Sequence, residues 1–243
     1  MSGLLAGHRI LVTGAAGTIG RAVVSAVAAE GGTPIGADIA QTAWVDYLVD
    51  VTSEAEWARV VEGIEAEHGQ LDGLVTAAGI IHVASLQDTT YADFRRVMSI
   101  NVDGTFLACK AMWPLLQRSS APSIVTVSSV SGIVGGAKFA AYNASKGAVR
   151  LLTKSMALSG AREQPAIRAN SVHPAFVEGE MVDGIAAKMR EPAKGHEKMR
   201  SMVPLGRFAE PAEIATTIMG LLSPASAFTT GAEIVLDGGL TAE

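Results

Sequence analysis

Short apolar segments alternate with longer amphipathic segments along the whole chain of 243 residues. The short segments are rich in Val, Ile and Leu and have few polar interruptions, which is typical of strands buried on both faces. They span residues 9–12, 34–37, 44–49, 71–77, 123–127, 168–172 and 233–236. The longer segments have helical periodicity and span residues 19–30, 54–68, 91–117, 140–162 and 211–222. The alternation predicts βαβ units and one parallel sheet of seven strands.

One long stretch, residues 174–204, follows neither pattern and is rich in Met, Lys and Glu. In a compact domain such a stretch is more often a substrate lid than an idle loop. The chain contains no repeat, linker or low-complexity tract, and its length suits one α/β sheet with its covering helices. We therefore expect one catalytic domain over residues 1–243, with a lid at about residues 174–205.

Composition narrows the class of protein. Hydrophobic residues make up 49% of the chain and charged residues 18%, which excludes intrinsic disorder. The net charge of −5 and the lack of a basic run argue against nucleic-acid partners and anionic membrane surfaces. A single cysteine, Cys109, forms neither an internal disulfide nor a zinc cluster, so no metal site is expected. Without a leader or an apolar run of about eighteen residues, the chain is expected to be cytoplasmic.

A glycine-rich turn follows the first predicted strand directly. It reads Thr-Gly-Ala-Ala-Gly-Thr-Ile-Gly over residues 13–20 and places Gly14, Gly17 and Gly20 at three-residue spacing. A strand, a glycine turn and a helix N-terminus together present free backbone N–H groups to a diphosphate, here with Thr18 and Ile19 inside the turn. The alternative is a tight turn that needs glycine for its backbone conformation alone.

Asp38 ends the second predicted strand, 18 residues after Gly20. At this offset an acidic side chain binds the adenosine ribose diol, and its charge repels the additional phosphate of NADP. The flanking residues 15–17 and 39–40 include no basic residue, so NAD is the predicted cofactor. The alternative for Asp38 is a solvated turn residue. Asp50 and Val51 end the third strand and would reach the adenine edge, or else they are a strand end beside a helix cap.

Tyr142 and Lys146 lie four residues apart, one helical turn, at the start of the fourth predicted helix. A free phenol with a pKa near 10 is ionised to only about one part in a thousand at pH 7, so a neighbouring ammonium is needed to make it a base. Ser129 lies 13 residues before Tyr142, where the fifth strand ends, and could hold a substrate oxygen. A nucleophilic serine is disfavoured because no G-x-S-x-G elbow surrounds it and only His173 among the histidines lies at a comparable strand end.

Together these motifs resemble the short-chain dehydrogenase/reductase family in its compact single-domain form. The resemblance covers nearly the whole chain and rests on Thr13, Asp38, Asp50, residues 77–79, Asn101, Ser129, Tyr142, Lys146, Pro174 and residues 237–239. It implies a doubly wound seven-stranded Rossmann fold and a homo-oligomer, either a tetramer or a dimer. Small residues on the two long helices are consistent with such an interface.

The resemblance also implies roles for the site residues. Tyr142 would be the general acid/base and Ser129 would orient the substrate oxygen. Lys146 would bind the nicotinamide ribose and lower the pKa of the tyrosine. Asn101 would hold a water that continues the proton relay, although a polar break in a long helix is the alternative. Further cofactor contacts are implied at four positions: Ala78, Gly79, Pro174 and Val177, the last through its backbone.

Three departures from the family pattern stand out. The second glycine of the turn is Gly17, one position early, with Thr18 in its usual place, a spacing closer to the extended epimerase-like branch. The usual Asn-Ala-Gly begins with Ala77, so an asparagine that braces the central strands is missing. The Pro-Gly and the threonine that usually flank the nicotinamide are replaced at Ala175 and Gly179, so a hydroxyl contact is lost.

These observations predict NAD(H)-dependent interconversion of a secondary alcohol and a ketone. The substrate is expected to be apolar, cyclic or steroid-like if lid and rim side chains line the site rather than pack internally. Those side chains are Met181, Ile185, Met189, Met199 and Met202 of the lid and Ile80, Ile81, Val83, Val134, Phe139 and Phe176 of the rim. Three alternatives remain. A ketoacyl-carrier reductase is opposed by Asp38, a sugar-nucleotide epimerase or dehydratase lacks its substrate domain, and a non-catalytic NAD sensor does not need the proton relay.

Overall fold

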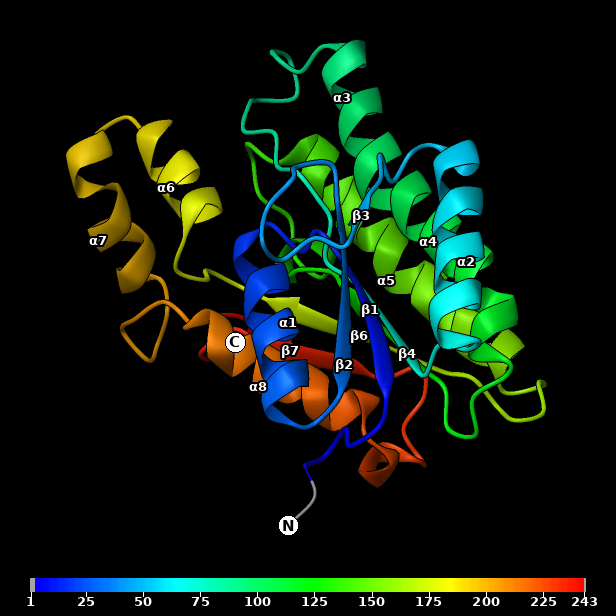
Figure 1. The fold of residues 1–243 in the computed structure, drawn as a ribbon. Coiled ribbons are helices and arrows are strands. Elements are labelled where there is room, and N and C mark those ends of the chain that lie inside the picture. The colour runs from blue at the N-terminus through cyan, green and yellow to red at the C-terminus, as the bar shows by residue number, and fades with distance from the viewer. Residues whose placement is uncertain (1–2, 243) are drawn as a thin grey trace.

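A computed structural model describes residues 3–242 as one parallel seven-stranded sheet with helices on both faces (Figure 1). The strand order is β3-β2-β1-β4-β5-β6-β7. The strands are β1 Arg9–Thr13, β2 Thr33–Asp38, β3 Tyr47–Leu48, β4 Gly73–Thr76, β5 Ser123–Val127, β6 Arg168–Pro174 and β7 Glu233–Leu236. The predicted doubly wound fold is therefore confirmed.

Eight α-helices occur in residues 3–242: α1 Thr18–Ala29, α2 Glu54–His68, α3 Tyr91–Met98, α4 Gly104–Leu116, α5 Ala140–Gly160, α6 Glu180–Ala187, α7 Gly195–Ser201 and α8 Pro211–Leu222. Helices α1 and α8 pack on one face of the sheet, and α2, α4 and α5 pack on the other (Figure 1). Over the same residues, no helix has both the length and the apolar character that a membrane crossing requires.

The strand order reverses between β1 and β4, which lie side by side although β2 and β3 separate them in the chain. At such a switch point the connections from the two strands diverge to opposite faces, and a crevice opens at the carboxyl ends of the strands. The sheet topology thus places a binding site beyond Thr13 and Thr76, the last residues of the two strands.

Three sequence-based elements differ from the structure by more than one or two residues at an end. The strand over residues 44–49 is only β3, because Asp46 instead bonds the backbone of Gly36 through its carboxylate, 2.7 Å from the Gly36 N–H. The stretch at residues 174–204 contains two short helices, α6 and α7, too short to show a clear period. The helix over residues 91–117 is divided into α3 and α4 by a π-helical segment, Ser99–Asp103.

Asn101 lies within this π-helical segment, and its side chain explains why the helix is interrupted there. Its side-chain amide makes two hydrogen bonds to the backbone of Ile80. Oδ1 accepts from the N–H at 2.8 Å, and Nδ2 donates to the C=O at 3.0 Å. A π-bulge widens one turn of a helix and often marks a functional position. Here it brings the Asn101 amide to the chain that leaves β4.

Arg168 at the start of β6 caps the C-terminal end of α8 from inside the protein. The residue is only 8% exposed, and its guanidinium donates to the carbonyls of Leu221, Leu222 and Ser223 at 2.8 to 3.3 Å. The last carbonyls of a helix have no partner within the helix, so a buried end needs donors from elsewhere. Arg168 supplies them where water cannot reach.

We predict that Arg168→Met lowers the free energy of unfolding by about 3 kcal/mol, because buried carbonyls lose their only charged donor. Arg118→Met is the matched control. Arg118 also donates to a helix end, the carbonyl of Gly69 at 2.9 Å, but its side chain is 46% exposed, so water replaces it and the cost stays below about 1 kcal/mol. Urea denaturation of both variants tests this, and equal losses would contradict the assigned role of Arg168.

Candidate active site

A cavity of about 360 Å³ opens at the carboxyl edge of the sheet. Its walls come from the turn before α1, the ends of β4, β5 and β6, the start of α5, and α6. Eleven of the predicted site residues line it: Gly14, Gly17, Thr18, Ile19, Gly20, Gly79, Ser129, Tyr142, Lys146, Pro174 and Val177. The cavity lies at the position that the switch point predicts.

The glycine turn forms a tight cradle at the N-terminus of α1. Gly14 has a φ of +68°, and a Cβ there would lie 2.6 Å from the backbone nitrogen of Ala78. A Cβ at Gly20 would lie 2.0 Å from the carbonyl oxygen of Gly14. No side chain caps this helix, and its first turn has no acidic residue, so its first N–H groups and positive dipole end are available to an anion. The cradle fits a diphosphate.

Asp38 ends β2 beside this turn. One carboxylate oxygen accepts from the N–H of Ala16 at 3.0 Å and the other from the N–H of Ala40 at 3.0 Å. These two bonds fix the carboxylate, and each oxygen keeps a further lone pair. A pair of vicinal hydroxyls fits this acceptor arrangement. Asp38 lies outside the residues that line the 360 Å³ cavity, so a ligand that reaches both would be extended.

Asp50 and Val51 are engaged with the chain that leads into α2. Asp50 Oδ1 accepts from the N–H of Thr52 at 2.9 Å and from its hydroxyl at 2.7 Å, and the Val51 carbonyl accepts from Trp57 Nε1 at 3.0 Å. Neither residue lines the cavity. Both residues lie beyond β3, which ends at Leu48, so the expectation that they end the strand was wrong, and contact with an adenine stays a prediction.

Tyr142 and Lys146 occupy the first turns of α5, and both are buried, with exposed fractions of 7% and 6%. The Lys146 ammonium lies 5.6 Å from the centre of the Tyr142 ring and donates to the carbonyl of Val127 at 2.9 Å. Burial raises the pKa of Tyr142 to about 12, an effect that contact with the Ser129 hydroxyl opposes. Burial also lowers the pKa of Lys146 to about 8. The pair is thus a neutral phenol beside a buried cation at pH 7.

Ser129 lies two residues beyond the end of β5, and its hydroxyl lies between Pro174 of β6 and the backbone of Ser131. The hydroxyl donates to the carbonyl of Pro174 at 3.3 Å and accepts from the N–H of Ser131 at 3.1 Å. The Pro174 bond is long, so a better acceptor at the cavity side can replace it. The structure therefore brings Ser129, Tyr142 and Lys146 together, as their spacing predicted.

The side chain of Asn101 lies behind this group rather than on the cavity wall. Besides its bonds to Ile80, its amide donates to Ser145 Oγ at 3.0 Å, so the amide ties α5 to the chain after β4. The backbone carbonyl of Asn101 accepts from the Thr105 hydroxyl at 2.7 Å. Ala78 is also absent from the wall, although its N–H, bonded to Thr13 Oγ1 at 3.2 Å, holds the central strands where the family's asparagine is missing.

Helices α6 and α7 form a small cluster of their own with Phe208. Met199 is buried inside this cluster and Met189 packs against it, so these two methionines do not face the cavity. The remaining expected lid residues do: Met181, Ile185 and Met202. Of the rim, Ile81, Val134, Phe139 and Phe176 line the cavity, whereas Ile80 and Val83 do not.

Gly179, at the start of α6, lies against the side chain of Thr18 in the cavity wall. A Cβ at Gly179 would lie 2.5 Å from Thr18 Oγ1. The two departures from the family pattern therefore fit each other, since the side chain of Thr18 occupies the room that a side chain at residue 179 would need. The hydroxyl absent at Gly179 is present at Thr18.

Leu240 and Val182 also line the cavity, and neither was predicted from the sequence. Leu240 reaches it because the chain reverses after β7 at Gly238 and Gly239, which both have positive φ, and Asp237 closes the turn by accepting from the Gly239 N–H at 2.9 Å. The Asp-Gly-Gly sequence was the available signal for this reversal. Val182 gave none, because the helix that presents it has only eight residues.

Comparison with known proteins agrees with this geometry. A family model described as enoyl-(acyl carrier protein) reductase matches residues 14–241. The NADP-dependent (R)-specific alcohol dehydrogenase of Lentilactobacillus kefiri is 34% identical, over 98% of this chain and 88% of its own. The 3-alpha-(or 20-beta)-hydroxysteroid dehydrogenase of Mycobacterium bovis is also 34% identical, over 100% of this chain and 92% of its own.

A solved structure shows the same fold. The ligand-free aldohexose dehydrogenase of Thermoplasma acidophilum superposes with a TM-score of 0.91 at 30% identity, over 98% of this chain and 95% of that one. The match thus extends over both the sequence and the fold. The chain belongs to the short-chain dehydrogenase/reductase family and is an oxidoreductase that acts on alcohol groups.

Proposed function

We propose that this protein uses NAD(H) to interconvert a secondary alcohol and a ketone. The observation that carries the proposal is the convergence of Ser129, Tyr142 and Lys146 on one cavity that also reaches the glycine cradle. When bound, oxidised NAD would accept the hydride from the alcohol, and NADH would supply it to the ketone. The residues that fit it are the cradle at Gly14, Gly17, Thr18, Ile19 and Gly20 for the diphosphate, and Asp38 for the adenosine ribose.

Tyr142 is the proposed general acid/base, with its phenolic oxygen taking the proton of the alcohol. Ser129 donates a hydrogen bond to the same substrate oxygen and holds it beside the phenol. Lys146 binds the nicotinamide ribose and stabilises the phenolate. The backbone carbonyl of Asn101 accepts from the Thr105 hydroxyl, and we assign to this carbonyl the water that leads the proton to solvent.

The charge on Lys146 matters for this chemistry. Bringing the pKa of Tyr142 from about 12 to about 7 requires about 7 kcal/mol of stabilisation of the anion. The Lys146 ammonium lies 5.6 Å from the centre of the phenol ring. A unit charge at about that distance contributes about 3 kcal/mol at an effective dielectric constant of about 20, which is about two pKa units. The positive charge of oxidised nicotinamide accounts for the rest in this proposal.

The remaining contacts of the cofactor follow from the walls of the cavity. The backbone of Val177 pairs with Ala209 through the groups of its neighbours, Phe176 C=O and Glu178 N–H, both at 2.9 Å. The N–H and C=O of Val177 itself therefore point away from this pairing, and we assign them to the nicotinamide carboxamide. Gly79 and Pro174 leave room for the nicotinamide ring and ribose, Ala78 supports the chain beneath them, and Asp50 and Val51 bind the adenine edge.

The substrate is proposed to be apolar and bulky, either cyclic or steroid-like. The support is the apolar wall opposite the cradle, formed by Ile81, Val134, Phe139, Phe176, Met181, Ile185 and Met202. The name of the hydroxysteroid dehydrogenase relative points to the same class. The lid over residues 174–205 closes this wall.

We further propose that the protein is cytoplasmic and a homo-oligomer, a tetramer or a dimer. Helices α4 and α5 leave Phe106, Leu151 and Leu158 exposed, by 47%, 65% and 72%. Such side chains on adjoining helices favour burial against a second copy. Light scattering that finds only monomer would contradict the oligomer.

The first experiment measures reduction of NAD and NADP with aliphatic, cyclic, terpenoid and steroid secondary alcohols. We expect turnover with NAD and a cyclic or steroid alcohol, and Tyr142→Phe should abolish turnover while it leaves the dissociation constant for NAD within about twofold, since the phenol acts on the proton. Unchanged turnover in Tyr142→Phe would remove the proposed mechanism. Preference for ketoacyl thioesters would favour a ketoacyl-carrier reductase, and tightly retained NAD without net turnover would favour an epimerase or dehydratase.

The second prediction concerns pH. Alcohol oxidation requires the Tyr142 anion, so its rate rises with pH through the pKa of the phenol. Lys146→Met removes the cation that lowers this pKa and should move the rising limb of kcat/KM upward by about two pH units. Lys110→Met, which loses a surface ammonium paired with Glu54, is the control and should leave the profile in place. Coincident profiles for Lys146→Met and the wild type would count against Lys146 as the source of stabilisation.

The third prediction concerns the cofactor. Asp38→Ala should lower the ratio of kcat/KM for NAD to that for NADP at least tenfold, because it removes both the diol acceptor and the charge that repels the additional phosphate. Asp38→Asn keeps one acceptor oxygen without the charge, so its ratio should fall between those of Ala and the wild type. A wild-type protein that prefers NADP, as the Lentilactobacillus relative's name would suggest, refutes the assignment of Asp38.

A further inference from the structure

His173 lies directly beneath Ser129 and is absent from the cavity wall. It belongs to β6 and its side chain is fully buried. Its Nδ1 lies 3.1 Å from the Ser129 carbonyl oxygen, and its Nε2 lies 2.8 Å from Ser171 Oγ. Because a carbonyl can only accept, Nδ1 carries the hydrogen. The Ser171 hydroxyl also reaches the Ala232 carbonyl, but at the longer distance of 3.4 Å, so its hydrogen is assigned to Nε2 at 2.8 Å. The contacts thus select one neutral tautomer.

The position of His173 matters because the ladder between β5 and β6 ends just before Ser129. The last ladder bond runs from the N–H of Ser128 to the carbonyl of Val172 at 2.9 Å. The next donor along β6 would be residue 174, and Pro174 has no N–H. The imidazole of His173 therefore supplies the link between the two strands at the point where the backbone cannot.

The Ser129 carbonyl accepts a second bond, from the N–H of Gly132 at 2.9 Å. Two donors from different elements hold this peptide, while Ser129 itself is extended with φ −169° and ψ 162°. A fixed backbone leaves only the χ1 rotation to the hydroxyl, and that rotation is limited by the bond from the Ser131 N–H at 3.1 Å. The direction of the Ser129 hydroxyl thus depends on the Nδ1–H of His173, which holds the Ser129 carbonyl.

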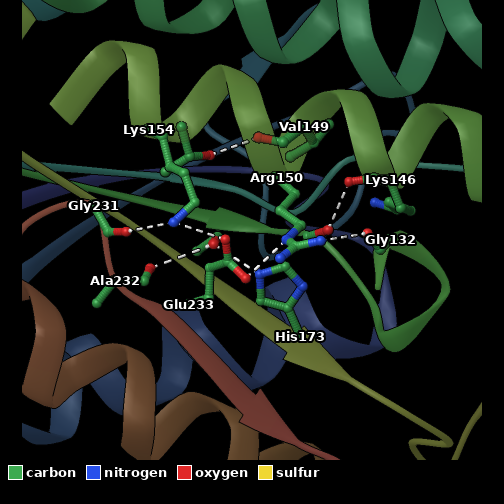
Figure 2. Close-up of polar contacts among 12 residues, drawn as sticks. Gly132, Lys146, Val149, Arg150, Lys154, His173, Gly231, Ala232 and Glu233 are labelled. Atoms are coloured by element: carbon green, nitrogen blue, oxygen red, sulfur yellow. Dashed lines mark hydrogen bonds and ion pairs between the residues drawn. The ribbon is translucent and has the colours of Figure 1, made fainter. Parts of the chain in front are cut away.

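Three of the charged groups around His173 are paired with one another (Figure 2). Glu233 on β7 binds Arg150 and Lys154 of α5, each at 2.8 Å. Arg150 also reaches the carbonyl of Gly132, at the weak distance of 3.5 Å. Burial lowers the pKa of His173, opposed by its bond to Ser129 and by Glu233, and supported by the charges of Arg150 and Lys146. The ring is neutral at pH 7.

We propose that His173 is a positioning residue for the reaction. Its Nδ1–H holds the Ser129 carbonyl and thereby aims the Ser129 hydroxyl at the substrate oxygen beside Tyr142. This inference rests on the proposed function, in which Ser129 donates to that oxygen. A hydroxyl displaced by a fraction of an ångström still allows NAD to bind but reduces the rate, since productive geometry is lost.

The first test reads the tautomer without turnover. Nitrogen-15 NMR of the ring nitrogens of the intact protein, in the presence of NAD, should show His173 protonated at Nδ1 and bare at Nε2 between pH 6 and 8, a window chosen around the ordinary histidine pKa of about 6.5. A ring protonated at Nε2 alone or at both nitrogens would overturn the proposal. This readout stands even if the wild type oxidises none of the alcohols screened.

The second test uses variants, with cyclohexanol and a steroid secondary alcohol as substrates. His173→Asn keeps an N–H near the place of Nδ1 and should retain kcat within about threefold, whereas His173→Leu should lower kcat by about ten- to a hundredfold with an unchanged dissociation constant for NAD. If the Leu variant does not fold, His173→Gln replaces it, since its longer side chain carries the amide toward the place of Nε2. Equal kcat values for Asn and for Leu or Gln would overturn the proposal.

Thr153→Val is the matched control. Thr153 is buried on α5 and bonds Thr126 Oγ1 of β5 at 2.7 Å, so its loss also removes a buried hydrogen bond between helix and sheet. This variant should lose stability with kcat unchanged. A comparable fall in kcat in Thr153→Val would show that the loss of any buried hydrogen bond slows the enzyme, and would overturn a specific role for His173. Absence of wild-type turnover, by contrast, would refute the proposed function itself.

Discussion

The ammonium of Lys146 lies inside the protein, and its charge is the constraint on which the arrangement of the site depends. A buried cation loses its hydration, which is why burial lowers its pKa to about 8. The carbonyl of Val127 compensates by accepting its hydrogen bond at 2.9 Å. That carbonyl ends β5, so the cation fixes the first turns of α5 against the sheet and holds Tyr142 at the cavity. One buried charge therefore links strand, helix and phenol.

The two sides of the cavity around Tyr142 and Lys146 differ in chemical character. The cradle at the start of α1 offers free N–H groups, and the first turn of the helix has no acidic residue, which suits an anion. The opposite wall is apolar and belongs largely to the lid. Where the two sides meet, Thr18 fills the space opposite Gly179, so a change in the glycine turn is matched by a change in the lid. Beneath the floor, His173 and Asn101 complete hydrogen bonds that the irregular chain after each strand leaves open.

Much of this arrangement was predictable from local patterns. The helices at residues 54–68 and 211–222 and the strands at 123–127 and 233–236 have the predicted bounds, because each is a regular apolar repeat between clear ends. Ser129, Tyr142 and Lys146 were also found, since a strand end and a helical turn place them without knowledge of distant contacts.

Other features depend on contacts that no local pattern reveals. The π-helical turn at Asn101 exists because the amide reaches Ile80, 21 residues earlier in the chain. Met199 packs into the lid rather than the cavity because Phe208 and Val182 surround it. The shortness of β3 and the role of Arg168 at the end of α8 likewise follow from partners that are close only in the folded chain.

The central claim is that the Tyr142 phenol ionises readily once the cofactor is bound in the site. The chain has only three tyrosines, so replacement of Tyr47 and Tyr91 by Phe leaves Tyr142 as the single reporter in carbon-13 NMR of labelled phenol rings. In the cofactor-free protein the ring should remain protonated throughout the neutral pH range, because burial raises the pKa of the phenol. With oxidised NAD bound, the account predicts ionisation well below the ordinary tyrosine pKa of about 10. A phenol that still ionises at or above that value in the complex would contradict it.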